Sequence, residues 1–144
     1  MIIDNLLILD PNPTSVLASQ ASTNVIDLGA DRDISVGDAF EPKLELDVVT
    51  AFATTTSATL QVQFETSPDN ATWTVLDQSP VYSAAQLGVG RIWPIDVPGG
   101  IQRYIRLGYV VGTGSFTAGQ VTAALIIDRA NATAYPSGYS NQYV

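Results

Sequence analysis

Histidine and cysteine are both absent from the 144 residues of this chain. Without histidine, Ser/His/Asp and Cys/His nucleophilic systems cannot form in their usual versions, and histidine-liganded zinc or iron sites are excluded. Without cysteine there is no disulfide framework and no thiolate chemistry. The sequence therefore lacks the side chains on which most familiar hydrolases depend.

Positive charge is also scarce. Six Lys and Arg stand against 14 Asp and Glu, a formal net charge of -8, and Lys43 is the only lysine. Because clustered Lys and Arg neutralise phosphate, this composition disfavours binding to nucleic acid and to anionic membranes. Charged residues make up 14% of the chain, against about 25% in an average soluble domain. Much of the surface must therefore be uncharged and polar, or covered by partners.

The first ten residues, MIIDNLLILD, are apolar but short. They lack a positive segment and are interrupted by Asp4 and Asp10, so we expect neither a signal peptide nor a membrane span. Prolines at 11 and 13 exclude a continuous helix or a central strand. Two interpretations of residues 1–23 remain open: an edge strand packed on its own domain, or an arm that docks on a neighbouring subunit.

Short stretches in which apolar and polar residues alternate follow one another along the chain, and a period of two indicates a β-strand. SPDNAT predicts a turn that joins two of them as a hairpin, and Pro94 restricts another to an edge or a bulge. With no helical stripe of useful length, the pattern predicts a sandwich or barrel of about eight strands, of the jelly-roll or immunoglobulin-like kind. The expected strands are 24–29, 43–52, 59–66, 72–77, 81–85, 91–97, 103–111 and 121–127.

The stretch from Arg103 to Asp128 reads as a β-hairpin around the glycine-rich segment GTGSFTAG. Its second strand is apolar on both faces except at Thr122 and Asp128, which predicts a central or subunit-covered position. The segment is not a phosphate loop, because Thr117 stands where the motif requires glycine and no lysine follows. We therefore expect turn chemistry there, with glycine supplying positive φ angles.

Two groups of carboxylates are candidate chemical sites. Glu45 and Glu65 could form the acid and base pair of a glycosidase, but alternation places both on the solvent face, which favours ordinary surface residues. Four aspartates, Asp27, Asp31, Asp33 and Asp38, lie in DLGADRDISVGD, and oxygen-rich loops bind calcium. Their spacing does not match the calcium-loop motif, so an ordinary acidic loop is favoured and cation binding stays an open question.

Three aromatic residues, Trp73, Trp93 and Tyr82, could line a sugar-binding face, because aromatic rings offer a flat apolar surface with a polar handle. Such residues more often fill the core of a sandwich. A carbohydrate-binding or host-attachment module is therefore the alternative function.

Three stretches carry a resemblance to a known family. They are MIIDNLLILD, LQVQFETSPDNATWTVL and RYIRLGYVVGTGSFTAGQVTAALIID. Together they resemble the capsid cement proteins of tailed bacteriophages, in particular the Bbp16-like family. The similarity spans nearly the whole chain and rests on strand and turn patterns.

The resemblance implies an all-β fold, an antiparallel jelly-roll-like β-sandwich of about eight strands, with extended terminal segments. The expected parts are an N-terminal arm (1–23), the sandwich (24–129) and a C-terminal tail (130–144). It also implies a structural virion protein, not an enzyme, with no cofactor or metal. Such a protein is made in the host cytoplasm, binds the outside of the assembled phage head as a dimer or trimer, and reinforces contacts between major capsid protein subunits.

The family has no catalytic residues to transfer, so the candidate sites are contacts. We expect the apolar arm and the tail tyrosines to bury surface on the capsid or on a sister subunit. The candidate contact residues are Ile2, Ile3, Leu6, Leu7, Tyr135, Tyr139 and Tyr143.

Overall fold

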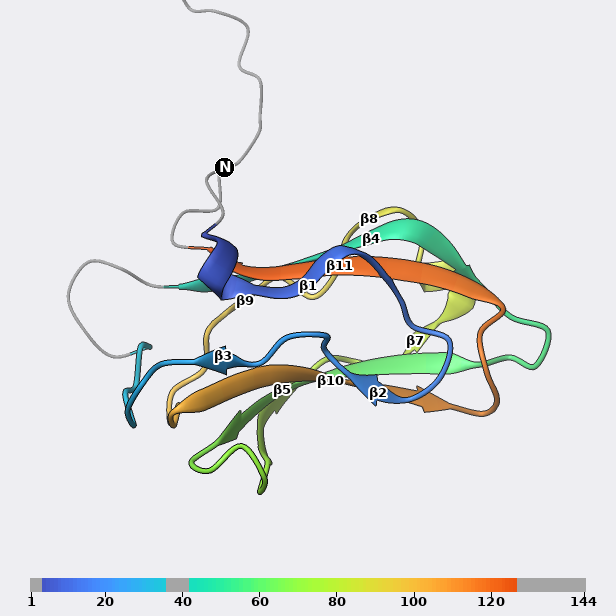
Figure 1. Ribbon diagram of the computed structural model, residues 1–144. Coiled ribbons are helices and arrows are strands. Elements are labelled where there is room, and N and C mark those ends of the chain that lie inside the picture. The colour runs from blue at the N-terminus through green and yellow to red at the C-terminus, as the bar shows by residue number, and fades with distance from the viewer. Residues whose placement is uncertain (1–3, 36–41, 127–144) are drawn as a thin grey trace, which may run out of the picture.

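Two antiparallel β-sheets face each other across a hydrophobic core (Figure 1). The computed structural model describes residues 4–35 and 42–126. Side chains alternate along each strand, so one set faces the partner sheet and the other faces outward. The predicted all-β sandwich is confirmed, with a five-stranded and a six-stranded sheet.

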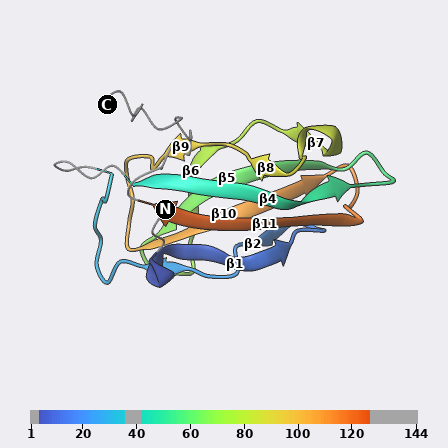
Figure 2. The same ribbon diagram turned by 90° about the horizontal axis from the view of Figure 1, so that it is seen from above.

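The five-stranded sheet, here called sheet A, has the order β1-β11-β4-β8, and β9 also pairs with β4 (Figure 2). Its strands are β1 (Ile8–Ser15), β4 (Lys43–Ala53), β8 (Gly90–Arg91), β9 (Ile95–Asp96) and β11 (Ala118–Ile126). β8 and β9 are short edge strands separated by Ile92, Trp93 and Pro94. The prediction that Pro94 restricts this part of the chain to an edge or a bulge is confirmed.

The six-stranded sheet, sheet B, has the order β2-β10-β5-β6, with β3 on β10 and β7 on β5. Two 3₁₀ helices, η1 (Asn5–Leu7) and η2 (Ala84–Gln86), complete the described elements. The hairpin predicted around SPDNAT is confirmed, because β5 pairs with β6. The strands of sheet B are β2 (Gln20–Ala21), β3 (Ile26–Asp27), β5 (Thr59–Ser67), β6 (Thr74–Gln78), β7 (Tyr82–Ser83) and β10 (Tyr104–Gly112).

Strands near the two ends of the described chain pair with each other, and strands closer to its middle pair in turn. β1 pairs with β11, and β2 and β3 both pair with β10. Next, β4 pairs with β8 and β9, and β5 pairs with β6 and β7. Two further ladders, β11 on β4 and β10 on β5, close these pairs into the two sheets.

The predicted hairpin from Arg103 to Asp128 is wrong. β10 belongs to sheet B and β11 to sheet A, so the link between them crosses the sandwich. The physical reason is Phe116, which is 3% exposed and packs edge-on against Phe52 at 4.8 Å between ring centroids. Burial of this ring draws the link into the core instead of letting it turn within one sheet.

Glycine in the segment GTGSFTAG has the role that the sequence predicted for it, at the point where the link enters β11. Gly119 has a φ of 152°, and a Cβ at this position would lie 2.3 Å from Cδ1 of Phe52. Only glycine lets the backbone approach the ring so closely.

The second strand of the same stretch is central, as predicted. β11 lies between β1 and β4, and its outward-facing Ala124 and Ile126 are buried along with the inward-facing residues.

The described part of residues 1–23 joins the sandwich. β1 is an edge strand of sheet A, and its register is irregular on both sides of Asp10, where Pro11 and Pro13 interrupt the ladder. The edge-strand interpretation therefore holds for this segment. The arm is fixed at its base, since Leu9 and Val16 are fully buried in the core.

Candidate contact surfaces

Two of the predicted contact residues fall in the described part of the chain, Leu6 and Leu7, and they behave differently. Leu6 is 79% exposed, whereas Leu7 packs against the core. Asp4 fixes their short helix, because its side chain accepts a hydrogen bond from the Leu6 amide at 2.9 Å. Leu6 is thus held outward on a capped turn. The others, Ile2, Ile3, Tyr135, Tyr139 and Tyr143, lie outside the described residues.

The aspartates after β3 are bound to the backbone and side chains of neighbouring segments. Asp27 receives two hydrogen bonds from the Arg103 guanidinium, at 2.8 and 3.0 Å, and Asp31 accepts one from the Arg103 amide. The bonds from Arg103, followed by the Gly29 amide, lower the pKa of Asp27 from 3.8 to about 2. These carboxylates fasten the loop to the start of β10.

Asp33 and Asp69 are used in the same way. Asp33 accepts hydrogen bonds from Ser35 and from the Gly100 amide, and these bonds lower its pKa. Asp69 closes the turn between β5 and β6, where bonds from the Thr72 and Ala71 amides lower its pKa to about 2. Within residues 4–35 and 42–126, no group of three or more acidic side chains could hold a metal ion. Asp38, the remaining member of the predicted acidic loop, lies outside these ranges.

The expectation that Glu45 and Glu65 are solvated is wrong. Glu45 is 4% exposed and accepts a hydrogen bond from Arg91, and Glu65 is 9% exposed and accepts one from Arg106. The alternation of apolar and polar residues correctly places both glutamates on the outer faces of their sheets, but neighbouring side chains cover them there. Because β4 and β5 belong to different sheets, the two carboxylates lie on opposite sides of the sandwich and cannot act on one glycosidic bond.

The three aromatic residues of the candidate sugar-binding face, Trp73, Trp93 and Tyr82, lie in different environments. Trp93 is 8% exposed and belongs to the core, and Tyr82 packs against that core. Trp73 lies on the outside of sheet B, where the Arg106 guanidinium stacks 4.0 Å from its ring centroid. The three rings therefore share no common face.

A buried polar cluster that the sequence did not reveal joins the two sheets. Asp10 is 1% exposed and accepts hydrogen bonds from the Thr23 amide at 2.8 Å, the Thr23 hydroxyl at 2.9 Å and the Tyr109 hydroxyl at 2.6 Å. Burial, followed by the nearby Asp10 charge, raises the pKa of Tyr109 well above its usual value. In the sequence, Asp10 only appeared as an interruption of an apolar run.

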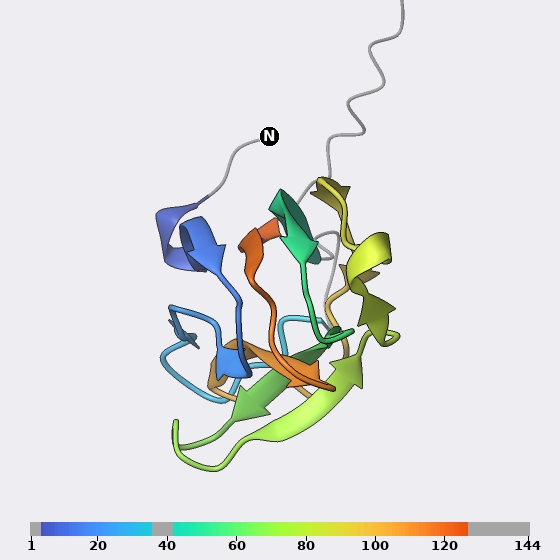
Figure 3. The ribbon, with the colours of Figure 1, turned by 90° about the vertical axis from the view of Figure 1, so that its right-hand side faces the viewer.

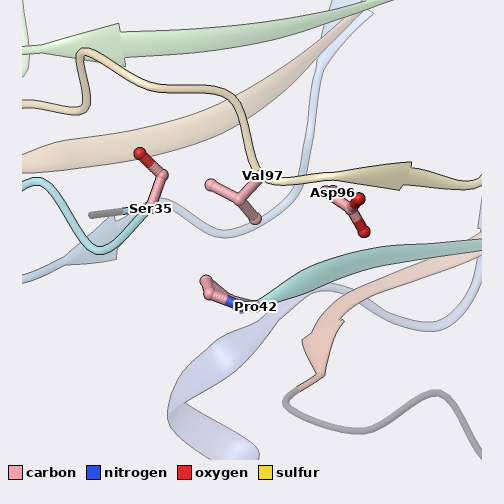
Figure 4. A pocket seen from close by; sticks show the side chains of 4 residues that line it. All are labelled: Ser35, Pro42, Asp96 and Val97. Carbon is pink, nitrogen blue, oxygen red and sulfur yellow. The ribbon is translucent and has the colours of Figure 1, made fainter. Parts of the chain in front are cut away.

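A shallow pocket lies between the loop after β3 and the β9 edge (Figure 4). Its lining includes Ser35, Pro42, Asp96 and Val97. Its carboxylate, Asp96, is bound to Lys43 at 2.6 Å. This carboxylate therefore serves as a partner of Lys43 at the sheet edge.

The model of the Bbp16 family matches residues 12–125. The chain belongs to the Bbp16 family. The Bbp16 match begins within β1 and ends within β11, so it takes in both sheets. No curated protein matches the sequence. In the described ranges, no helix is long and apolar enough to cross a membrane.

Proposed function

We propose that this Bbp16 family member is a capsid cement protein, which binds the outside of an assembled phage head and stabilises contacts between major capsid protein subunits. The observation that carries the proposal is the use of its acidic side chains. Asp10 joins the two sheets through the core, and Glu45 and Glu65 pair with arginines of neighbouring strands on the outer faces of their sheets. Asp27, Asp33 and Asp69 fasten the loops. The acidic side chains of this chain therefore stabilise the fold, which is typical of a structural protein that acts through its surface contacts.

We also propose that the sandwich is a jelly roll. Support comes from the pairing of the outermost strands with each other and of the inner strands in turn, which is the pattern of a long antiparallel hairpin rolled into two sheets. Jelly rolls recur in viral capsid proteins. Fold alone does not specify function, so the family membership and the surfaces must support the capsid role as well.

A cement protein acts by mass action. A subunit that binds only the assembled, expanded shell stabilises that shell over its dissociated subunits, by about 2.7 kcal/mol per site when the free protein is at 100 times its Kd. Many identical sites act on one particle, so each contact can be modest.

Leu6 is the described residue best suited to such a contact. It is 79% exposed, lies on a helix turn capped by Asp4, and is followed within three residues by the fully buried Leu9. A short rigid connection to the core limits the entropy lost when the side chain is buried on a partner. Deletion of residues 1–9 would remove Leu9 as well, so a point substitution is the sharper test.

The test is co-sedimentation of the full chain with expanded heads from which the cement layer has been removed. We expect saturable binding to expanded heads, weaker binding to unexpanded ones, and reduced occupancy for Leu6→Glu. The matched control is Val75→Glu, an exposed apolar residue on β6. Equal occupancy of all three proteins would contradict a contact at Leu6, and absence of binding to any head would contradict the capsid role.

The alternative, a carbohydrate-binding or host-attachment module, is favoured by one observation. Trp73 is a partly exposed tryptophan on an outer face, stacked on Arg106, and jelly rolls also occur in lectins. Glycan binding that is lost on Trp73→Ala, together with absence of head binding, would favour this function over the cement role.

A further inference from the structure

The outer face of sheet B is a single surface whose residues are set by the strand register. Sheet B is the lower layer in Figure 3, so this face points downward there. Along β10 the side chains of Ile105, Leu107 and Tyr109 are buried in the core, and the residues between them point outward. Pairing with β5 and β6 arranges the outward residues in rows that cross the sheet. The rows are Tyr104 with Ser67, Arg106 with Glu65 and Val75, Gly108 with Gln63 and Gln78, and Val110 with Gln61.

These rows carry no net charge. Arg106 and Glu65 form an ion pair in the second row, and the other residues of the rows are uncharged. At the margin of the face, Arg103 pairs with Asp27. The whole chain, in contrast, has a formal net charge of -8. Because binding surfaces match their partners in charge, this face suits an uncharged ligand.

Trp73 is fixed on this face by a series of contacts. It directly precedes β6, and continuation of the register places it opposite Ser67. The Arg106 guanidinium stacks 4.0 Å from its ring centroid, and Arg106 donates a hydrogen bond to Glu65. Glu65 can lie flat on the sheet because Gly108 has no side chain, and a Cβ there would lie 3.1 Å from Glu65 Oε1. The partly exposed ring is therefore held in one orientation before any ligand binds.

Two glutamine amides lie on the same face. Gln63 is partly exposed and Gln78 is exposed, and the two are cross-strand neighbours on β5 and β6. Each amide offers two N–H donors and a carbonyl acceptor. Successive rows are about 7 Å apart, because two residues separate them along a strand, so the amides lie roughly 14 Å from the row of Trp73.

We propose that this face binds an uncharged oligosaccharide, with Trp73 as the stacking residue and Gln63 and Gln78 as the hydrogen-bonding residues. A sugar ring has an apolar face of C–H groups, which packs on an aromatic ring. It also has a rim of hydroxyls, which exchange hydrogen bonds with amides. The distance between the tryptophan and the amides requires a chain of several sugar units.

This site goes beyond the proposed function and does not depend on it. Of the three aromatic residues considered from the sequence as a sugar-binding face, only Trp73 belongs to it, and strand pairing adds the two glutamines. The proposed head contact, Leu6, lies on η1, which contacts β11 of sheet A. The glycan site lies on the other sheet, so a head and a glycan can be bound at the same time.

The test begins with an array of uncharged oligosaccharides, probed with the full chain in the absence of heads. Calorimetry then measures the Kd for the oligosaccharide that binds best. We expect Trp73→Ala to raise this Kd by roughly tenfold or more, and Gln63→Ala and Gln78→Ala to raise it by about two- to tenfold each. The matched control is Gln120→Ala, a partly exposed glutamine of sheet A, which should leave the Kd unchanged.

The glutamine variants keep the contact between Trp73 and Arg106, so they remain informative if Trp73→Ala disturbs the turn before β6. Three results would overturn the inference: no binding to any uncharged oligosaccharide, equal weakening by Gln120→Ala, or an unchanged Kd for all three face variants while circular dichroism shows a native fold. Glycan binding by a protein that binds no head would leave this inference standing and contradict the cement role. Head binding without glycan binding would do the reverse.

Discussion

At the scale of single residues, the buried cluster of Asp10, Thr23 and Tyr109 connects the edge strand β1 to the centre of sheet B. A carboxylate that is 1% exposed must have hydrogen-bond donors, because a buried unsatisfied polar group costs about 1–3 kcal/mol. Sheet A thus gains a polar connection through the core that complements hydrophobic packing.

Tyr109→Phe tests this cluster. It removes the donor that lies 2.6 Å from Asp10 Oδ2 and leaves the ring in place, so we expect a loss of about 1–3 kcal/mol in the free energy of unfolding. Urea denaturation measures it, with Tyr82→Phe, a less buried tyrosine, as the control. An unchanged urea midpoint for Tyr109→Phe would show that the bond contributes nothing to stability.

Stability should also fall in acid because of Asp27 and Asp69. In the folded protein the pKa of each is about 2, below its usual 3.8. A lowered folded pKa stabilises the protein above the unfolded value and stops doing so as pH falls through the folded one. We therefore expect the Tm to drop between about pH 4 and 2, and Asp69→Asn to have a flatter profile there. Identical profiles for wild type and variant would contradict this role of Asp69.

Sequence patterns predict which face of a strand a residue lies on, but not which side chains from other strands cover it. Alternation assigns Glu45 and Glu65 to the outer faces, which is correct, but it does not reveal that Arg91 and Arg106 lie over them. Those arginines are distant in sequence and reach the glutamates only through strand pairing. Asp10 could not be identified for the same reason, since its partner Tyr109 is 99 residues away.

At the scale of elements, most strands follow from the sequence and their connections do not. Periodicity predicted β4, β5, β10 and β11 because each packs one face on the core. A glycine-rich link between two such strands looks the same in sequence whether it turns within a sheet or crosses to the other. The burial of Phe116 decides between them, and that depends on Phe52 in another strand.

Gly119→Ala tests the crossing link. Alanine would be strained at a φ of 152°, and its Cβ would overlap the Phe52 ring, so we expect a loss of about 1–3 kcal/mol from the backbone alone, with displacement of Phe52 in addition. Gly88→Ala is the control, since a Cβ there meets nothing within 4 Å. Thermal denaturation of both variants measures the difference, and equal Tm values would contradict a close approach at Gly119.

At the scale of the whole molecule, the two ends of the sandwich differ in charge. Neutral loops occupy one end, and aspartates and the capped Leu6 occupy the other. The composition alone predicts the low content of charged residues and the negative net charge. Only the strand order brings the uncharged segments together at one end of the sandwich.

The most direct test of the cement role is the temperature at which expanded heads fall apart, measured by light scattering with and without saturating protein. If the protein is a cement protein, we expect it to raise that temperature in proportion to occupancy, because a cement protein binds only the assembled shell. The proposal would be contradicted if the protein did not bind expanded heads, or if it bound them and left the disruption temperature unchanged.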